Sequence, residues 1–256
     1  MKGLIGSIYR RSIVIVAVLL AWTIVPLFIK HMFMPSLIDV LSALVKMLET
    51  GEMADHILSS LARAGAGVVI SVVLALPLGV LLGWYPKIEA YLNPLFTALR
   101  NTSILALLPL FVLFLGVGEI SKVAVIVFGC FFPMLLSTID GVKNVDPVLI
   151  QSARSMGISP FGLLSKVVVP AAMGFIISGF RLVCSISLLV LVGAEMLGAK
   201  SGLGFLIYRY EQSFQVPKMY AGILVMIVLG ILVNWLIGKL ERRLTIWQSV
   251  TDKETA

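Results

Sequence analysis

The chain has 256 residues, of which 59% are hydrophobic and only 13% are charged, and its mean hydropathy is +1.06. Soluble domains are about a quarter charged, whereas several apolar runs here are long enough to cross a bilayer core as helices. We therefore predict an all-α polytopic membrane protein with about six transmembrane helices. The net charge of +7 does not indicate nucleic-acid binding, because the basic residues are scattered among the connecting segments.

Residues 1–34 begin with Lys2, Arg10 and Arg11, which precede an apolar run over 12–29. This run is long for a signal peptide, and no small-residue cleavage site follows it. We predict a retained first span with a cytoplasmic N-terminus.

Residues 35–60 contain a short amphipathic helix. Its apolar residues recur at helical spacing: Leu37, Leu41, Leu44 and Leu48, with Val40 and Val45 beside them. Asp39, Ser42, Lys46 and Glu49 take the other face. Ser36 and Asp39 form a capping box at its start. A helix this short either lies at the membrane surface or packs on the bundle, and it does not span.

Residues 61–247 hold the remaining spans, which we place at about 61–84, 104–115, 123–139, 171–194 and 220–237. Ala75, Gly79 and Gly83 recur every fourth position, which allows a neighbouring helix to approach closely. We expect Arg63 to snorkel toward the head groups and Pro133 to break the fourth span. An inner turn is expected at 86–89, with the next helix starting at 93–94. Residues 248–256 form a cytoplasmic tail.

Polar residues within or beside these spans are candidates for a translocation path. A charge inside a membrane helix costs on the order of 3 kcal/mol, so it usually faces a cavity or a partner. The candidates are Asn101, Thr102, Ser103, Arg181, Ser185, Ser187 and Glu195. The alternative is that neighbouring helices or head groups satisfy the two charged members.

The loop over 141–170 is the one sizeable polar interruption in the second half of the chain. Asp146 is placed to cap a helix that starts at Pro147, and Gly157 is suited to end it. Ser159 and Pro160 repeat the cap-and-proline start, and Pro170 ends or kinks the second helix. Because basic residues are more numerous on the side of this loop, we place it in the cytoplasm. A structured inner loop is a docking surface for a soluble partner; an ordinary loop with two short helices is the alternative.

The sequence contains no phosphate-binding loop of the form G-x-x-x-x-G-K-[ST] and no plausible set of a nucleophile and a base. Cys130 and Cys184 fall inside predicted spans and are expected to act as small apolar residues. We do not predict an enzyme, and energy for active transport has to come from elsewhere. A self-contained channel or ion-driven carrier and a membrane-embedded enzyme are the competing interpretations.

The segment from Gln151 to Pro170 resembles the E-A-A, three residues, G, nine residues, I-x-L-P signature of the membrane subunits of binding-protein-dependent ABC importers. Stretches at 108–126, 141–147, 152–159 and 190–207 look like the branch that includes aliphatic sulfonate, taurine and nitrate permeases. The resemblance runs from about residue 35 to residue 247. It departs from the signature where Gln151 replaces glutamate and Ser152 replaces alanine, which removes a carboxylate from the start of the motif.

The resemblance implies a type I ABC importer permease fold with a cytoplasmic coupling helix and a short amphipathic periplasmic helix. The residues implied in coupling to an ATPase are Gln151, Ser152, Ala153, Arg154, Gly157, Ser159, Pro160 and Pro170. Two ATPase subunits, a second permease copy, a periplasmic or lipid-anchored binding protein and the bilayer are the implied partners. ATP and Mg²⁺ would bind to the ATPase, with no cofactor or metal in this chain. The implied location is the bacterial inner membrane, with both termini cytoplasmic. The implied substrate is an organosulfonate such as taurine or an alkanesulfonate, or nitrate; a thiamine-related pyrimidine or another small metabolite is the alternative.

Overall fold

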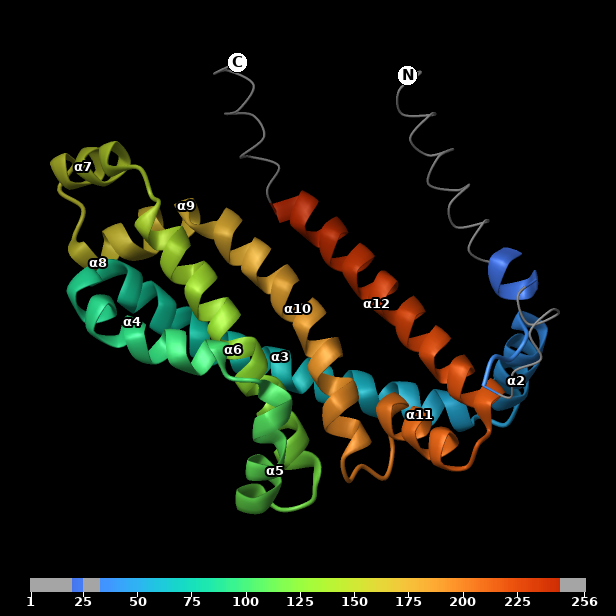
Figure 1. The fold of residues 1–256 in the computed structure, drawn as a ribbon. Coiled ribbons are helices and arrows are strands. Elements are labelled where there is room, and N and C mark those ends of the chain that lie inside the picture. Colours follow the sequence, from blue (N-terminus) through green and yellow to red (C-terminus); the bar gives the residue numbers. More distant parts are fainter. Residues whose placement is uncertain (1–19, 25–32, 245–256) are drawn as a thin grey trace, which may run out of the picture.

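A computed structural model describes residues 20–24 and 33–244 of the chain. Most of the first predicted span and the predicted tail lie outside these residues. In the described part every regular element is a helix. Four helices are long and apolar enough to cross a membrane: α3 (Glu52–Trp84), α6 (Glu119–Lys143), α10 (Met173–Met196) and α12 (Val216–Leu244). They form the tilted bundle seen in Figure 1.

A fifth crossing of the described chain is broken. Helices α4 (Pro86–Asn101) and α5 (Ile104–Leu115) meet at an angle of 93°, and together they are apolar enough to count as one bent span. Alone, α5 is about 18 Å long, which is shorter than the roughly 30 Å hydrocarbon core. The third span predicted over 104–115 is therefore only half of a bent element.

Small residues bring α3 and α6 into close contact. A Cβ atom added to Gly79 would lie 2.6 Å from Cβ of Thr138, and one added to Gly83 would lie 2.6 Å from Cβ of Val142. Ala75 is completely buried on the same stripe. The predicted close approach at every fourth residue is confirmed, and its partner is α6.

Several predicted boundaries are wrong. Helix α3 begins at Glu52, nine residues before the predicted start, and Pro86 opens α4 where a turn was expected. Glu89 lies in the first turn of α4, and its carboxylate pairs with Lys143 at 2.7 Å. Helix α6 runs unbroken through Pro133, because one missing backbone N–H is readily tolerated in a packed membrane helix.

The bundle has two differently built ends (Figure 1). At one end, which we call the α2 end, α2 (Leu37–Glu49) and α11 (Leu203–Gln212) pack over a small hydrophobic cluster beside the start of α12. At the other, the α7 end, lie four short helical pieces: α7 (Pro147–Ser155), α8 (Pro160–Leu163), η1 (Leu164–Val168) and α9 (Val169–Ala171). The main core lies between these ends and includes both cysteines, which are free and buried as predicted.

Candidate functional site

Helix α7 starts where the sequence predicts. The carboxylate of Asp146 accepts a hydrogen bond from the backbone N–H of Val148 at 2.8 Å, and Pro147 occupies the first helical position. The cap satisfies one of the orphan donors of the first turn, and proline has no donor to satisfy there. A nine-residue helix is thus held in place by local chemistry.

Gly157 ends α7 in a left-handed conformation, with φ of +76°. Its N–H donates to the carbonyl oxygen of Arg154 at 3.0 Å, and the N–H of Ile158 donates to the carbonyl oxygen of Ala153 at 3.3 Å. The six-residue closure from Ile158 to Ala153 is the Schellman pattern, which needs a residue that accepts positive φ. The predicted role of this glycine is confirmed.

The second helix of the loop starts at its predicted cap. The hydroxyl of Ser159 accepts a hydrogen bond from the N–H of Gly162 at 3.2 Å, and Pro160 follows. Its middle turn widens into the π-helical segment η1 just before Pro170. Since Pro170 has no N–H and crowds the carbonyl four residues earlier, the wider turn accommodates it. The helix ends one residue later, at Ala171, and α10 begins after one intervening residue.

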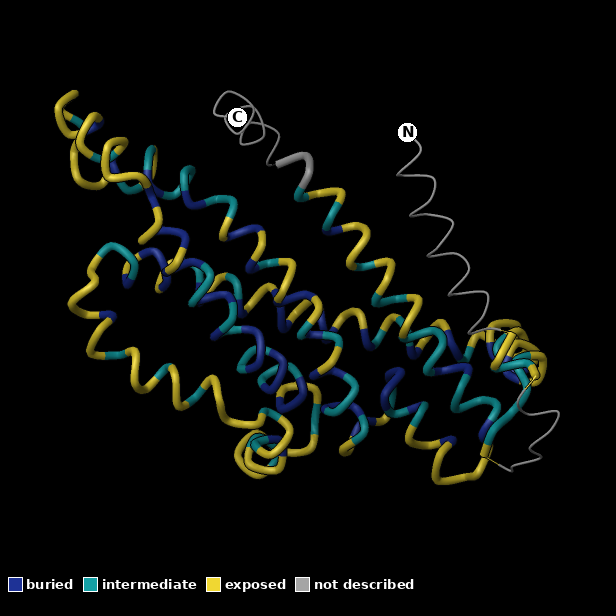
Figure 2. Tube along the Cα trace, turned by 45° about the horizontal axis from the view of Figure 1, so that its top comes forward, coloured by how far each residue is buried: buried dark blue, intermediate teal, exposed yellow. Residues whose placement is uncertain are grey.

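Much of the chain at the α7 end is exposed (Figure 2), and several of the exposed side chains there are apolar. Met156 and Phe161 are each 80% exposed, and Val148 and Leu149 are also largely exposed. Ala153 is buried, whereas Gln151, Ser152 and Arg154 are turned outward. Apolar and polar side chains are therefore both exposed at this end of the bundle.

The residues predicted for a translocation path do not form one cluster. Asn101, Thr102 and Ser103 are exposed and occupy the break between α4 and α5. On α10, Ser187 is buried, and its hydroxyl donates to the carbonyl oxygen of Cys184 at 2.8 Å.

Arg181 is half-exposed in a groove between α10 and α12. Its Nε donates to Oδ1 of Asn234 at 3.1 Å, and its Nη1 lies 3.1 Å from a carboxylate oxygen of Glu241. The groove has a volume of about 470 Å³, and Lys239 also lines it. Ser185 is exposed one turn further along, where its hydroxyl bonds to the carbonyl of Arg181 at 3.3 Å. Helix α12 thus supplies, through Glu241, the negative charge that pairs with Arg181. The sequence alone did not identify this partner.

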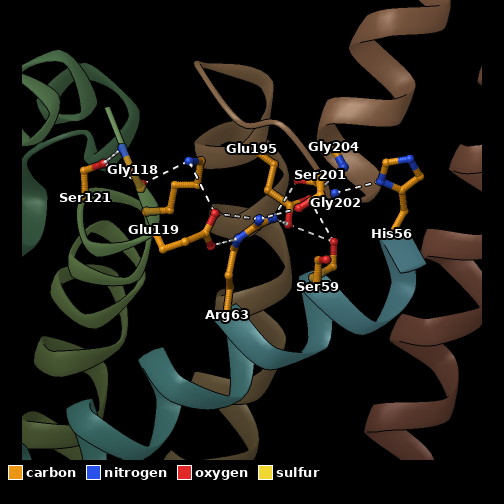
Figure 3. A network of polar contacts seen from close by, with 12 residues as sticks. His56, Ser59, Arg63, Gly118, Glu119, Ser121, Glu195, Ser201, Gly202 and Gly204 are labelled. Carbon is orange, nitrogen blue, oxygen red and sulfur yellow. Dashed lines mark hydrogen bonds and ion pairs between the residues drawn. The ribbon is translucent and has the colours of Figure 1, made fainter. Parts of the chain in front are cut away.

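At the α2 end, Arg63 is the centre of a buried polar network (Figure 3). Its guanidinium makes five hydrogen bonds: two to the carboxylate of Glu119, one to that of Glu195 at 2.6 Å, and two to Ser201. These use all of the N–H donors that an arginine has. The Arg63 side chain is only 5% exposed, so the prediction that it snorkels to the head groups is wrong.

Glu195 has no exposed surface, and its carboxylate is held from several sides. It accepts hydrogen bonds from the Ser60 hydroxyl and from the backbone N–H of Gly204, both at 2.8 Å. A Cβ atom at Gly202 would overlap this carboxylate, so a glycine is needed there. The N–H of Gly202 donates to Nδ1 of His56 at 2.9 Å, which fixes the loop over the start of α3.

The network joins three helices and one loop. Arg63 lies on α3, Glu119 begins α6, Glu195 ends α10, and Ser201 precedes α11. With Lys122, which is buried beside Glu119, the two positive and two negative charges balance. The sequence placed Arg63 and Glu195 at the same end of the protein but offered no signal that they meet.

Comparison with known proteins gives a consistent result. Residues 67–246 match the family described as "Binding-protein-dependent transport system inner membrane component". The chain is 35% identical over 216 residues to the putative aliphatic sulfonates transport permease protein SsuC of Bacillus subtilis, covering 84% of this chain and 78% of that protein. It is 33% identical over 244 residues to the taurine transport system permease protein TauC of Escherichia coli, covering 92% and 89%.

A further relative is the formylaminopyrimidine transport permease protein ThiX of Halalkalibacterium halodurans, at 33% identity over 75% of this chain and 77% of that protein. Among solved structures, the inward-facing MetNI methionine ABC transporter matches with a TM-score of 0.69 at 19% sequence identity. The match covers 75% of this chain and 96% of that one. At this identity the structural likeness supports the fold.

Proposed function

This chain belongs to the family of binding-protein-dependent transport system inner membrane components, and from that membership we propose that residues 151–157 dock it onto an ATPase subunit. The chain is the membrane permease subunit of an ABC importer. Membership of this family implies an ATPase partner and a substrate-binding protein. The permease itself is a transport component and not an enzyme.

The observation that carries the docking proposal is the exposed surface of the α7 end. Gln151, Ser152 and Arg154 face outward from a helix whose inner side is fixed by Ala153. Gln151 has both a donor and an acceptor, so it replaces the missing carboxylate of the signature with neutral hydrogen bonds. The exposed side chains of Met156 and Phe161 supply the apolar part of the same surface.

The connection from α7 to the membrane supports a mechanical role for this loop. Helix α7 packs on η1, and η1 continues through α9 into α10 with one intervening residue. A displacement of α7 by a docked ATPase would therefore move α10 as part of a rigid body. In this proposal the ATPase binds ATP and Mg²⁺, two ATPase subunits act on two permease copies, and closure of the ATPase pair turns the permease outward.

The proposed orientation places the α7 end and both termini in the cytoplasm of a bacterium, with the chain in the inner membrane. It is supported by the excess of Lys and Arg in the segments that adjoin the α7 end. The α2 end then faces the binding protein.

For the substrate, we propose a small organosulfonate such as taurine or an alkanesulfonate. The printed names of SsuC and TauC support this class, and nitrate or a pyrimidine such as the one named for ThiX is the alternative. Arg181, in its polar groove, and the polar break at Asn101, Thr102 and Ser103 would suit an anion. Some of the proposed path residues are exposed, namely Arg181, Ser185 and the three residues at the break. Ser187 and Glu195 are buried and would have to act from within the bundle.

The docking proposal is tested by copurification. The chain is solubilised from its native membrane, and the proteins that accompany it are identified and assayed for ATPase activity. In Gly157→Pro, proline cannot adopt the φ of +76° and removes the N–H that bonds to Arg154. We expect the ATPase subunit to be lost from this variant and retained by the wild type.

Gly116→Pro is the matched control, since Gly116 has φ of +79° and lies at the other end of the bundle, just after α5. It should retain the ATPase. Loss of the ATPase from both variants, or from neither, would contradict docking through 151–157. The substrate is tested separately: reconstituted complexes should show ATP-dependent uptake of labelled taurine that Arg181→Gln reduces. Uptake of a pyrimidine in preference to taurine would favour the alternative.

A further inference from the structure

Helix α2 has three different sides, and one of them has no partner in the described chain. Successive residues of an α-helix are rotated by about 100°, so side chains fall into sectors. The sector centred on Val40, Ala43 and Met47 is buried in the small hydrophobic cluster at the α2 end. This sector packs the helix against the start of α12 and the start of α3.

The sector next to it is apolar but exposed. Ile38 is 75% exposed, Leu41 46%, and Val45 and Leu48 52% each. At about 100° per residue these four positions fall within an arc of about 80°, adjoining the buried sector without a polar residue between them. The apolar surface of α2 is therefore nearly twice as wide as the part that the protein covers.

The third sector is polar and exposed, and it contains Asp39, Ser42, Lys46 and Glu49. Around the helix, the protein covers one side, the exposed apolar residues take a second, and the polar residues take the third. This arrangement fits a helix that lies in the plane of a membrane surface, with the bundle beside it, acyl chains on one flank and water on the other.

From this geometry we infer that α2 is a membrane-surface anchor whose residues Ile38, Leu41, Val45 and Leu48 insert into the lipid leaflet at the α2 end. Surfaces that bind other proteins are rich in Trp, Tyr and Arg, whereas these four residues are all aliphatic. Aliphatic side chains suit acyl chains, and interfacial helices bury such a face about 5–10 Å below the head groups.

Aromatic residues mark the same level of the membrane. The indole N–H of Trp22 donates to the carbonyl oxygen of Pro35 at 3.3 Å, just before α2 begins. The ring of Trp22 lies 5.9 Å from that of Tyr220 near the start of α12, and the Tyr220 hydroxyl lies 3.4 Å from the Phe33 carbonyl oxygen. Trp and Tyr are enriched where membrane meets water, so α2 begins at the depth that the inference requires.

The experiment measures which quencher reaches each side of α2. The full chain, purified with its partner subunits, carries Cys130→Ala and Cys184→Ala and is placed in phosphatidylcholine nanodiscs. An environment-sensitive fluorophore is attached to Leu41→Cys or Val45→Cys, with Ser42→Cys on the polar sector as the matched control. Quenching is compared between phosphatidylcholine that is spin-labelled near the top of the acyl chain and iodide in the buffer.

We expect the spin-labelled lipid to quench the labels at positions 41 and 45 more strongly than iodide does, and the order to reverse at position 42. Labels at 41 and 45 that respond to iodide and not to the lipid would overturn the inference, because the sector would then face water. Labels that neither quencher reaches would overturn it as well, because another protein chain would then cover the sector. None of these outcomes depends on the substrate or on docking of the ATPase.

Discussion

The network around Arg63 makes a sharp prediction about stability, because its two central charges are shielded from water. The Arg63 side chain is 5% exposed and that of Glu195 is 0% exposed, with 2.6 Å between Nη1 and Oε1. In Arg63→Met the carboxylate of Glu195 stays buried without its counter-charge. Breaking a buried pair in this way typically destabilises a protein by about 3–5 kcal/mol.

A matched control exists on the other side of the bundle. Arg181 and Glu241 also form an ion pair, at 3.1 Å, but their side chains are 47% and 24% exposed. Half-exposed pairs contribute about 0–1 kcal/mol, so Arg181→Met should have a small effect. The double variant Arg63→Met with Glu195→Leu removes both buried charges and should regain much of the loss, because apolar pairs often replace buried ion pairs without penalty.

The assay uses the two free cysteines, which are buried and become accessible to a thiol-reactive dye when the chain unfolds. At about 2–4 °C per kcal/mol for a chain of this size, Arg63→Met should lower the unfolding midpoint by roughly 6–20 °C. Equal small shifts for Arg63→Met and Arg181→Met would show that burial of the Arg63–Glu195 pair does not set its contribution to stability. So would a double variant that is less stable than Arg63→Met alone, since the loss would then not come from an unpaired charge.

Three further predictions concern single positions. Gly79→Ala should destabilise the chain by about 1–3 kcal/mol, because its new Cβ atom overlaps a side chain of α6, whereas Gly65→Ala, with nothing within 4 Å, should be neutral or stabilising in the same thermal assay. Burial, followed by the hydrogen bond to a carboxylate of α3, raises the pKa of Tyr210 to about 12, so its stabilising contribution is full below pH 10 and is lost as the pH rises toward 12. The stability difference between wild type and Tyr210→Phe should therefore shrink over that range, and a constant difference would contradict the assignment. Asp146→Ala should remove about 1 kcal/mol of helix capping and speed hydrogen exchange at the N–H of Val148 by roughly fivefold; unchanged exchange would mean that the cap does not hold α7.

Local chemistry made much of the loop at the α7 end predictable. Caps, prolines and a glycine that accepts positive φ act within a few residues, so Asp146, Gly157 and Ser159 could be read directly from the sequence. The small-residue stripe on α3 was predictable for a related reason, since Gly79 and Gly83 have no side chains to keep another helix away. The sequence did not reveal that α6 is the helix that packs closely against this stripe.

Contacts between distant segments were missed. Arg63 and Glu195 are 132 residues apart, and hydrophobic periodicity carries no information about which charges meet. The break between α4 and α5 was missed because the run over 104–115 is apolar throughout and so resembles a complete span. The run is nevertheless too short to cross the membrane by itself. The second apolar sector of α2 was merged with the first, because the sequence shows apolar spacing but not how much of it the bundle covers.

Site-specific photo-crosslinking would detect the proposed contact between α7 and an ATPase subunit in the membrane itself. A photoreactive amino acid is introduced at Gln151, which is exposed on α7, and at Lys200, which is exposed at the α2 end, in the chain expressed in its native membrane. We predict that position 151 forms a crosslink to an ATPase subunit, identified by mass spectrometry, and that position 200 does not. No ATPase crosslink from position 151, or equal crosslinking from both positions, would show that α7 is not the docking element.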